Sequence, residues 1–553
     1  MLICGIKASH DGGVAVVDGD RLLFSTEIEK LANAPRYSAL GRLELITEIL
    51  ATEGLKPADI DRFVVDGWWT EGAGGGTAIQ TGLAGRAFEL PVAPYLDGTD
   101  GPLHPHLFDG HNFGGAAEGY VSYHHVSNHV MGAYVSSPFA VRGEDSLVLV
   151  WDGGMVPRLY HVGNRTRTVT ALAPLLPITG NSFGDFSGQF EPFWRDTSDL
   201  TEDETVRYHL SIAGKAMAYA ALGKVEESAF KVFDELLAGF SRIELETART
   251  LGAKIAANRD QLLPGLSNAD LIATFQAYLG HRLLDALATL LRRRFPGQRP
   301  QLAIAGGCAL NIKWNSLLRN SGLFQEIWVP PFPNDAGAAI GTAACELFRT
   351  GQHAALRWDV YSGPQLVQSE LPSGWTSRPY DESQLAALLH AEGEPVVVLS
   401  GRAEIGPRAL GNRSILAPAT SAATKDQLNV IKDRAFYRPV APICLTERAE
   451  EVFTPGGADP YMLFEHHVRA DWVDRIPAVM HLDGSARLQT IDQSANSATS
   501  RILAAYAELS GIPVLCNTSA NLNGSGFFPD VASAAHWGGT KYIWSDGVLH
   551  TKA

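Results

Sequence analysis

One succession of elements occurs twice in this chain: an apolar strand, a glycine-rich turn beside an acidic residue, and a hairpin. The first copy begins with LICGIKA, passes through His10-Asp11-Gly12 to GVAVV, and turns at Asp18-Gly19-Asp20 into RLLFSTEIE. Asp-Gly between apolar runs predicts a tight hairpin, because glycine accepts the positive φ that such a turn requires. The second copy is LVLVWD at Leu147–Asp152, followed by Gly153-Gly154 and the hairpin-like PRLYHVGNRTRTVTAL. The repeat predicts a domain built from two related halves.

A duplication of this kind resembles the ASKHA-type ATPases, in which two related halves place their first hairpins around the nucleotide phosphates. Apolar residues at steps of three and four predict a helix from Ser267 to Arg294, with Ser267 and Asp270 as its N-terminal cap. The strand QLAIA breaks at Gly306-Gly307 and enters a helix from Ala309, a turn that can bring backbone N–H groups to a ligand. A further helix is predicted within the segment DAGAAIGTAACELF.

The periodic pattern lapses around Thr350–Asp381, a stretch rich in Pro, Gly and Ser that is typical of a domain boundary. It resumes with a helix near Leu385–His390 and the buried strand PVVVLS, and the order helix then strand returns in the last fifty or so residues. We therefore predict an α/β protein with a first domain at residues 1–355, a linker at 356–380 and a second α/β domain at 381–553.

Charge and cysteine content narrow the partners and the compartment. Lys plus Arg number 45 against 60 Asp plus Glu, a formal charge of −15, which disfavours nucleic acid and anionic lipid surfaces. The 5 cysteines are scattered without CxxC spacing, so neither a disulfide framework nor a thiolate zinc site is implied. The opening residues do not read as a signal peptide, and no apolar run reaches the roughly 18 residues of a membrane span. We expect a cytoplasmic protein with no nucleic-acid or membrane partner.

The segment YHHVSNH carries the sharpest local signal for metal binding. On a helix, His125 and His129 are one turn apart, and their imidazoles can converge on one cation. Asp152, at a strand end, and Asp335, in an Asn-Asp-Ala-Gly turn, are candidate carboxylate ligands. Such a set suits Fe(II), Mn(II) or Zn(II). The alternatives are a plain pair of helix-face histidines, in a chain that has 17, and aspartates that cap turns.

Basic residues gather in the second domain despite the acidic whole. Guanidinium groups beside glycines and prolines, where loops leave strands, could hold phosphate or carboxylate oxygens. The alternative is a solvated basic face that pairs with the surplus acids. His10-Asp11 could act as a base with an orienting carboxylate, or only form a turn. The basic residues concerned are Arg402, Arg408, Arg413, Lys432, Arg434, Arg438 and Arg487.

These segments together resemble the NodU/CmcH family of O-carbamoyltransferases, which modify nodulation oligosaccharides and antibiotics. The opening MLICGIKASHDGG looks most like the branch that carbamoylates a cephem hydroxymethyl group. The other matching pieces, in chain order, are His125-x-x-x-His129, Asp152-Gly-Gly, GKAMAYAALGK, AGGCALN, NDAGAAIG, GPRALGNRSILA, NVIKDRAFYRPVAP and NTSAN.

The resemblance implies an ASKHA-type first domain and a YrdC-like second domain. The second domain would turn carbamoyl phosphate and ATP, with Mg²⁺, into carbamoyl-adenylate, and the first would transfer the carbamoyl group to the hydroxyl of a small metabolite. The implied metal, usually iron with Zn or Mn as substitutes, has the ligands His125, His129, Asp152 and Asp335, beside the catalytic His10 and Asp11. The implied pocket for carbamoyl phosphate and nucleotide consists of Arg408, Lys432, Arg438, Arg487, Ser519 and Asn521. The implied adenylate contacts in the first domain are Gly306, Gly307, Asn311 and Lys215.

Two positions depart from the family pattern. The lysine expected after the first hairpin falls near Pro35, where Arg36 is a stand-in, and Asn523 occupies the usual place of an arginine. Trp68-Trp69, followed by TEGAGGGT, fit the core better than the wall of an acceptor pocket. The base rate for symmetric assemblies favours a homodimer. A tRNA threonylcarbamoyl-type transferase, disfavoured by the acidic charge, and a non-catalytic ATP-binding module remain as alternatives.

Overall fold

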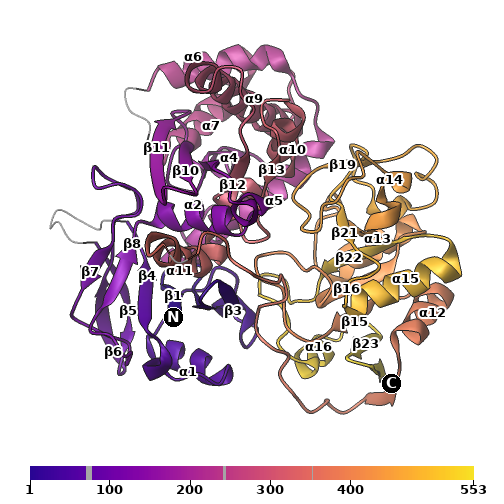
Figure 1. Ribbon diagram of the computed structural model, residues 1–553. Helices are drawn as coiled ribbons and strands as arrows, with labels where there is room; N and C mark the ends of the chain where they lie inside the picture. Colours follow the sequence, from indigo (N-terminus) through magenta and orange to yellow (C-terminus); the bar gives the residue numbers. More distant parts are fainter. Residues whose placement is uncertain (70–76, 241–243, 352) are drawn as a thin grey trace.

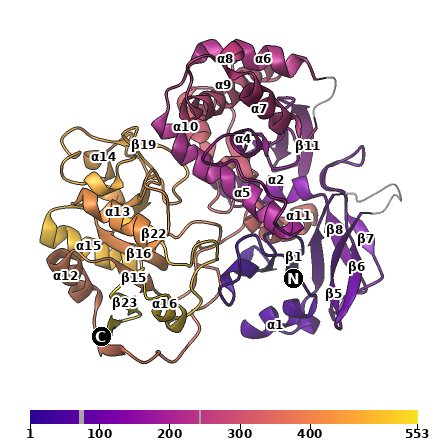
Figure 2. The same ribbon diagram turned by 180° about the vertical axis from the view of Figure 1, so that it is seen from behind.

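A computed structural model describes residues 1–69, 77–240, 244–351 and 353–553. The chain forms two α/β parts that lie side by side, the first drawn in indigo to brown and the second in orange to yellow (Figures 1 and 2). The glycine-rich segment after Trp69 lies largely outside the described residues. Among the described residues, no helix combines the length and apolar character needed to cross a bilayer.

The first part contains two sheets of the same design. One has the order β3-β2-β1-β4-β8-β7 and the other the order β11-β10-β9-β12-β13. In each, the first strand pairs antiparallel with the following hairpin and parallel with a later strand, so the predicted duplication is present. The strands are β1 Leu2–Lys7, β2 Gly13–Asp18, β3 Arg21–Glu27, β4 Arg62–Asp66, β7 His106–Phe108, β8 Tyr120–Tyr123, β9 Ser146–Val150, β10 Arg158–Gly163, β11 Thr168–Pro174, β12 Leu302–Ala305 and β13 Ile327–Trp328.

Two buried helices, α2 His125–Val135 and α11 Ala338–Arg349, pack against each other between the two sheets (Figure 1). Their close crossing requires glycine, because a Cβ on Gly341 would lie 2.1 Å from the Asn128 carbonyl oxygen. Both helices are buried along almost their whole length, and the polar residues of α2 gather in its first turns. The crossing brings the start of α2 next to the turn that precedes α11.

A helical layer covers the second sheet. The predicted long helix is α9 Asn268–Arg294, and Ser267 and Asp270 form its capping box. Its leucines and Phe275 join the strands of the second sheet in one core. The layer also contains α4 Ser182–Ser187, α5 Glu202–Tyr219, α6 Phe230–Ala238, α7 Thr247–Ala257, α8 Arg259–Leu262 and α10 Ile312–Asn320.

The second part is an 8-stranded mixed sheet with the order β14-β24-β23-β15-β16-β22-β17-β21. Alternate residues of β15 face opposite cores: Val396 and Val398 pack under α12 and α15, while Val397 and Leu399 pack on the side of α13 and α16. The elements are β14 Trp375–Pro379, α12 Glu382–Glu392, β15 Val396–Leu399, β16 Arg413–Pro418, α13 Ala422–Ile431, β17 Ala441–Leu445, β21 Gln489–Ile491, α15 Ala498–Ser510, β22 Val514–Ser519, α16 Val531–Trp537, β23 Tyr542–Ser545 and β24 Val548–Lys552.

The segment predicted as a linker, residues 356–380, connects the two parts, but it ends in a strand. Trp375–Pro379 pairs antiparallel with β24 at the edge of the sheet. Four of its five side chains are exposed, so the buried alternation that identifies a strand from sequence is missing. The smaller elements are α1 Glu44–Thr52, β5 Ala78–Leu83, β6 Arg86–Pro91, α3 Pro138–Arg142, α14 Ala449–Val452, β18 Phe453–Thr454, β19 His466–Val468 and β20 Ser485–Ala486.

Candidate active site

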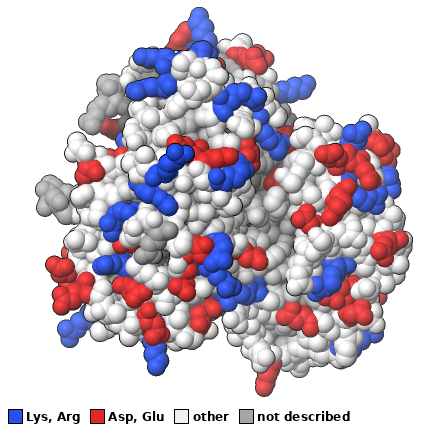
Figure 3. All heavy atoms as spheres, in the orientation of Figure 1, with Lys and Arg blue, Asp and Glu red and all other residues white. Residues whose placement is uncertain are grey.

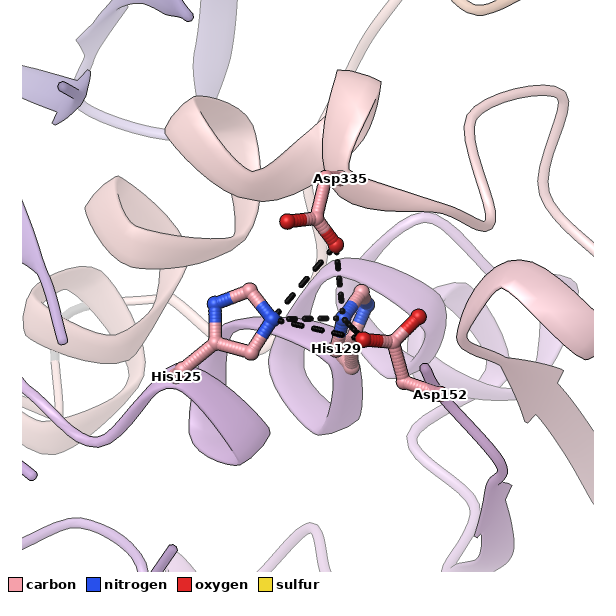
Figure 4. Close-up of side chains that lie close together, drawn as sticks. All are labelled: His125, His129, Asp152 and Asp335. Atoms are coloured by element: carbon pink, nitrogen blue, oxygen red, sulfur yellow. Dashed lines mark hydrogen bonds and ion pairs between the residues drawn. The ribbon is translucent and has the colours of Figure 1, made fainter. Parts of the chain in front are cut away.

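His125 and His129 lie one turn apart on α2, as predicted, and they meet Asp152 and Asp335 in the interior. Asp152 follows β9 and Asp335 precedes α11, so the four side chains come from three segments and point toward one centre (Figure 4). The two Nε2 atoms are 3.2 Å apart, and each lies 3.4 Å from Asp335 Oδ1. Asp152 Oδ2 lies 3.6 Å from the His125 Nε2 and 3.7 Å from that of His129. Ligands about 2.0–2.2 Å from one ion have such spacings.

Neighbouring groups hold these side chains in the ligating orientation. The Nδ1 of His125 is 2.7 Å from Asp66 Oδ2, which leaves its Nε2 lone pair directed at the centre. The buried Lys7 lies 2.9 Å from both Asp66 and Asp335. Burial alone would raise the pKa of Asp335, but Lys7 and the histidines outweigh it and hold that pKa well below its usual range. The donor set, two imidazoles and two carboxylates, therefore fits a divalent transition metal.

His10 and Asp11 stand in the loop between β1 and β2, at the edge of this centre. The Nδ1 of His10 is 3.0 Å from Asp11 Oδ2 and 3.7 Å from Asp335 Oδ2. Asp11 has a φ of 53°, a conformation that costs energy for a residue with a Cβ and that is common at functional sites. The edge of Trp68 packs on the His10 ring, with ring centroids 5.1 Å apart. Trp68 also contacts His125, so this half-buried tryptophan both packs against the core of the first sheet, as predicted, and borders the centre.

A second site lies where the two parts of the chain meet. A cavity open to solvent, with an empty volume of about 930 Å³ that includes its mouth, is lined by five arginines, four of the second part and one of the first, and by residues of α5 and α10. Among the described residues that line it there is no carboxylate. Burial and the neighbouring arginines lower the pKa of Arg408 to about 10 and that of Arg434 to about 9. The arginines are Arg36, Arg408, Arg434, Arg438 and Arg487.

Among the described residues, these guanidinium groups have no carboxylate partner, which a buried charge normally has. In the described part of the chain, none of Arg408, Arg438 and Arg487 forms a salt bridge. The buried Nε atoms of Arg408 and Arg487 have no hydrogen-bond partner. Clustered arginines repel each other, and an anion relieves that repulsion while satisfying their N–H groups. The cavity is therefore built for an anion of high charge, such as a phosphate or pyrophosphate group.

Two family models match the chain over most of its length. The model described as carbamoyltransferase N-terminus matches residues 2–74 and 116–345, and the one described as carbamoyltransferase C-terminus matches residues 386–542. The chain belongs to the NodU/CmcH carbamoyltransferase family. It is therefore a transferase enzyme, and each matched region corresponds to one part of the fold.

Relatives of this carbamoyltransferase include nodulation protein U of Sinorhizobium fredii, which is 44% identical over 100% of this chain and 99% of its own length. The 3'-hydroxymethylcephem-O-carbamoyltransferase of Streptomyces clavuligerus is 35% identical over 95% of this chain and 94% of its own. This order of identity is the reverse of the branch likeness expected from the opening residues. Among solved structures, HypF of T. kodakarensis is similar over 64% of this chain and 48% of its own, with 14% identity and a TM-score of 0.37.

The predicted phosphate-binding residues of this carbamoyltransferase do not all face the cavity. Arg408, Arg438, Arg487 and Ser519 line it, whereas Lys432 lies behind the loop that follows β22. Lys432 Nζ donates to the carbonyl oxygen of Ser519 and to Oδ1 of Asn521, at 2.9 and 2.7 Å. Asn521 is thus bound to Lys432 rather than directed into the cavity. Lys432 and Asn521 shape the loop that carries Ser519.

The residues predicted to contact adenylate also lie in different places, and most of them have a structural partner. The Gly307 N–H donates to Asp152 Oδ1 at 2.7 Å, so the glycine turn holds a residue of the metal centre. A Cβ on Gly306, at a φ of 90°, would lie 2.3 Å from the Trp151 carbonyl oxygen. Asn311 uses its Oδ1 as the N-cap of α10. Lys215 instead lies on α5 between Gly214 and Met217, which line the cavity, and burial and the nearby Arg438 lower its pKa.

The sequence interpretation missed several residues of the cavity. From the sequence, Arg434 is one of several basic residues of the second domain, without a role of its own. In the structure its guanidinium donates to Thr518 Oγ1 at 3.0 Å beside the cavity. Lys313 of α10 reaches from the first part of the chain. Arg36 is held beside the second part because its backbone N–H donates to the Gly524 carbonyl oxygen at 2.8 Å, in the loop that also carries Asn523. The side chain of Asn523 is exposed and contacts Asp433. Arg36 and Asn523, the two departures from the family pattern, therefore lie close together where the two parts of the chain meet.

Proposed function

We propose that the chain is an ATP-dependent O-carbamoyltransferase with one half-reaction at each site. At the arginine cavity, water hydrolyses carbamoyl phosphate to carbamate and phosphate, and a carbamate oxygen attacks the α-phosphorus of ATP. Pyrophosphate leaves and carbamoyl-adenylate remains. At the His125 centre, the hydroxyl of a small metabolite attacks the carbamoyl carbon, and AMP leaves with the electron pair of the broken bond.

The single observation that carries the first half-reaction is the cluster of unpaired arginines. Carbamoyl phosphate, ATP and pyrophosphate are all highly charged, and fixed cations around them stabilise the charge that builds up as phosphoryl bonds break. Arg408, Arg438 and Arg487 are the residues best placed to do this, and Ser519 can donate its hydroxyl. Mg²⁺ accompanies ATP as the bridging cation.

Two groups carry the second half-reaction. His125, His129, Asp152 and Asp335 would hold Fe(II), Mn(II) or Zn(II), which supplies a Lewis acid for phosphate and carbonyl oxygens when bound. Asp11 accepts from His10 Nδ1, which leaves His10 Nε2 free to take the proton of the acceptor hydroxyl. The half-buried Trp68 covers this histidine and offers an apolar wall to the acceptor.

The fold supports the same assignment. The two sheets with equal strand order match the duplicated design of ASKHA-type proteins, and the mixed sheet of the second part is our candidate for the YrdC-like unit. The relatives named for nodulation and for hydroxymethylcephem favour a small hydroxylated natural-product intermediate as acceptor. We propose a cytoplasmic enzyme without a nucleic-acid or membrane partner. On the face in Figure 3, positive and negative side chains are interspersed.

The test is pyrophosphate release from ATP by purified protein, with and without carbamoyl phosphate, in the absence of an acceptor. Release that depends on carbamoyl phosphate supports adenylate formation, and it should be lost in Arg487→Ala. Arg501→Ala is the matched control, because Arg501 is exposed and pairs with Glu382 far from the cavity. If release is absent with every candidate acceptor added, the assignment of the cavity is wrong.

A further inference from the structure

A second group of histidines lies beside the first centre and is used by none of the steps above. Asp100, His104 and His106 come from the loop that enters β7, and His124 immediately precedes α2. His104 Nε2 and His106 Nε2 are 3.9 and 3.7 Å from Asp100 Oδ2, and His124 Nε2 is 3.7 Å from Asp100 Oδ1. Three imidazoles thus surround one carboxylate.

The orientation of His124 is fixed by the backbone. Its Nδ1 donates to the Pro94 carbonyl oxygen at 3.1 Å, so its Nε2 carries a lone pair. That lone pair faces His106 Nε2 at 3.4 Å. A carbonyl that binds the outer nitrogen of an imidazole is the usual support for a metal-ligating histidine, because it fixes both the tautomer and the ring orientation. His124 is only 2% exposed, so this nitrogen lone pair is inside the protein and pointed at the cluster.

We propose that Asp100, His104, His106 and His124 bind a second divalent metal ion of the zinc type, distinct from the ion of the His125 centre. Three nitrogens and one oxygen form a tetrahedral set that suits Zn²⁺. Neighbouring ligands of a tetrahedral zinc ion are about 3.3–3.5 Å apart, since each bond is about 2.0–2.1 Å long. The observed spacings exceed this by at most about half an ångström, a shift that the half-exposed His104 and Asp100 can make.

The ion would fasten a loop that lies over the first centre. Tyr95 of this loop donates to Asp152 Oδ2 at 2.6 Å, and its carbonyl oxygen accepts from the Val126 N–H at 3.0 Å. The Pro102 carbonyl oxygen accepts from the hydroxyl of Ser127. Asp100, His104 and His106 lie within residues 75–115, which the family models do not match, whereas His124 lies in the matched region. Metal bound there would hold Tyr95, and with it the wall of the first centre, in place.

The experiment is zinc titration of tag-free full-length protein that has been stripped with a chelator. Bound zinc is counted by mass spectrometry, and affinity is measured in competition with a chromophoric chelator. The His104→Ala, His106→Ala double variant should bind one equivalent less than the wild type, and the loss should add to that caused by His129→Ala. Asp100→Asn should weaken the second site by at least about tenfold.

His111→Ala is the matched control, since His111 follows β7 and contacts the rings of Phe88 and Phe113 instead of the cluster. It should bind as much zinc as the wild type. Equal zinc content in the double variant and the wild type would overturn the proposal. A loss of zinc in His111→Ala as large as that in the double variant would also overturn it, because zinc would then bind surface histidines without specificity. Far-ultraviolet circular dichroism verifies folding. If the double variant does not fold, the zinc affinities of Asp100→Asn and His106→Gln test the proposal, and affinities equal to that of the wild type would overturn it.

Discussion

Replacing Arg36 with alanine separates a ligand-binding role from a structural one. Arg36 belongs to the first part of the chain, yet its side chain lines the cavity among the arginines of the second. It is one of the positive charges that lower the pKa values of Arg408, Arg434 and Arg438, after burial itself. Its removal therefore takes a like charge out of a crowded cationic cluster. The backbone bond from Arg36 to Gly524 survives in the variant.

The expected magnitude follows from these contacts. A hydrogen bond from a guanidinium to a charged ligand contributes about 1.5–3 kcal/mol, so the dissociation constant for carbamoyl phosphate or pyrophosphate should rise about 10- to 150-fold. In the absence of ligand the relief of repulsion among the arginines opposes two losses, a 3.4 Å contact from Nε to the Ser525 carbonyl oxygen and the attraction to the buried Glu29, so stability should change little. Weaker binding with little change in stability is the signature of a residue placed for the ligand.

Thermal unfolding with increasing pyrophosphate measures both quantities in one series, because a ligand that binds the folded state raises Tm by mass action. Arg36→Lys should restore part of the affinity. Arg42→Ala is the control, since Arg42 is close in sequence but forms an exposed pair with Glu48. Unchanged pyrophosphate affinity in Arg36→Ala, or a loss of more than about 2 kcal/mol of stability without ligand, would refute the reasoning.

Three further predictions concern single residues. His10→Asn should abolish carbamoyl transfer while leaving carbamoyl-phosphate-dependent pyrophosphate release intact, and unchanged transfer would remove His10 from the mechanism. Gly341→Ala should cost more than about 2 kcal/mol in denaturant unfolding and reduce the bound metal, because the new methyl group meets the Asn128 carbonyl oxygen at 2.1 Å. Burial, only partly offset by Arg249, raises the pKa of Asp185 to about 6, so the contribution of Asp185 to stability falls as pH rises from about 4 through 6. Asp185→Asn should lack that loss in Tm measured across this range.

Local sequence patterns were sufficient to predict most of the helices and strands named in the sequence analysis. Both hairpins, α9 with its cap, and the helix that carries His125 and His129 lie where the sequence predicts them, because each is defined by neighbours in the chain. The four residues of the His125 centre were also predictable as a candidate set, since the two aspartates follow strand or turn signals that can be identified locally. Their convergence depends on the crossing of α2 and α11, which the sequence does not show.

The arginine cavity was only partly predictable, because it is assembled from both parts of the chain. Arg36 and Lys313 are far in sequence from Arg408 and Arg487, and no periodicity relates such residues. Lys432 carries the same charge as its neighbours, yet the backbone directs it to the loop after β22. The second histidine cluster was missed for a related reason. His104 lies in an irregular loop and His106 begins the short strand β7, and their spacing indicates a site only when the fold places His124 beside them.

The first hairpin connects the two proposed half-reactions physically. His10 lies at the turn that begins it, and Arg36 lies in the segment that follows it, so one stretch of chain contributes to both sites. Between them, the buried Glu27 accepts from the Gly406 N–H at 2.7 Å, and Lys30 donates to the Gly406 carbonyl oxygen at 2.8 Å. Gly406 begins the segment that carries Arg408. A displacement of one part against the other would therefore have two effects at once. It would move Arg36 out of the cavity, and it would break the bonds of Glu27 and Lys30 to Gly406 that hold the hairpin beside His10. Since effects of positioning on rate are steep, adenylate formation and transfer should depend on the same docked arrangement of the two parts.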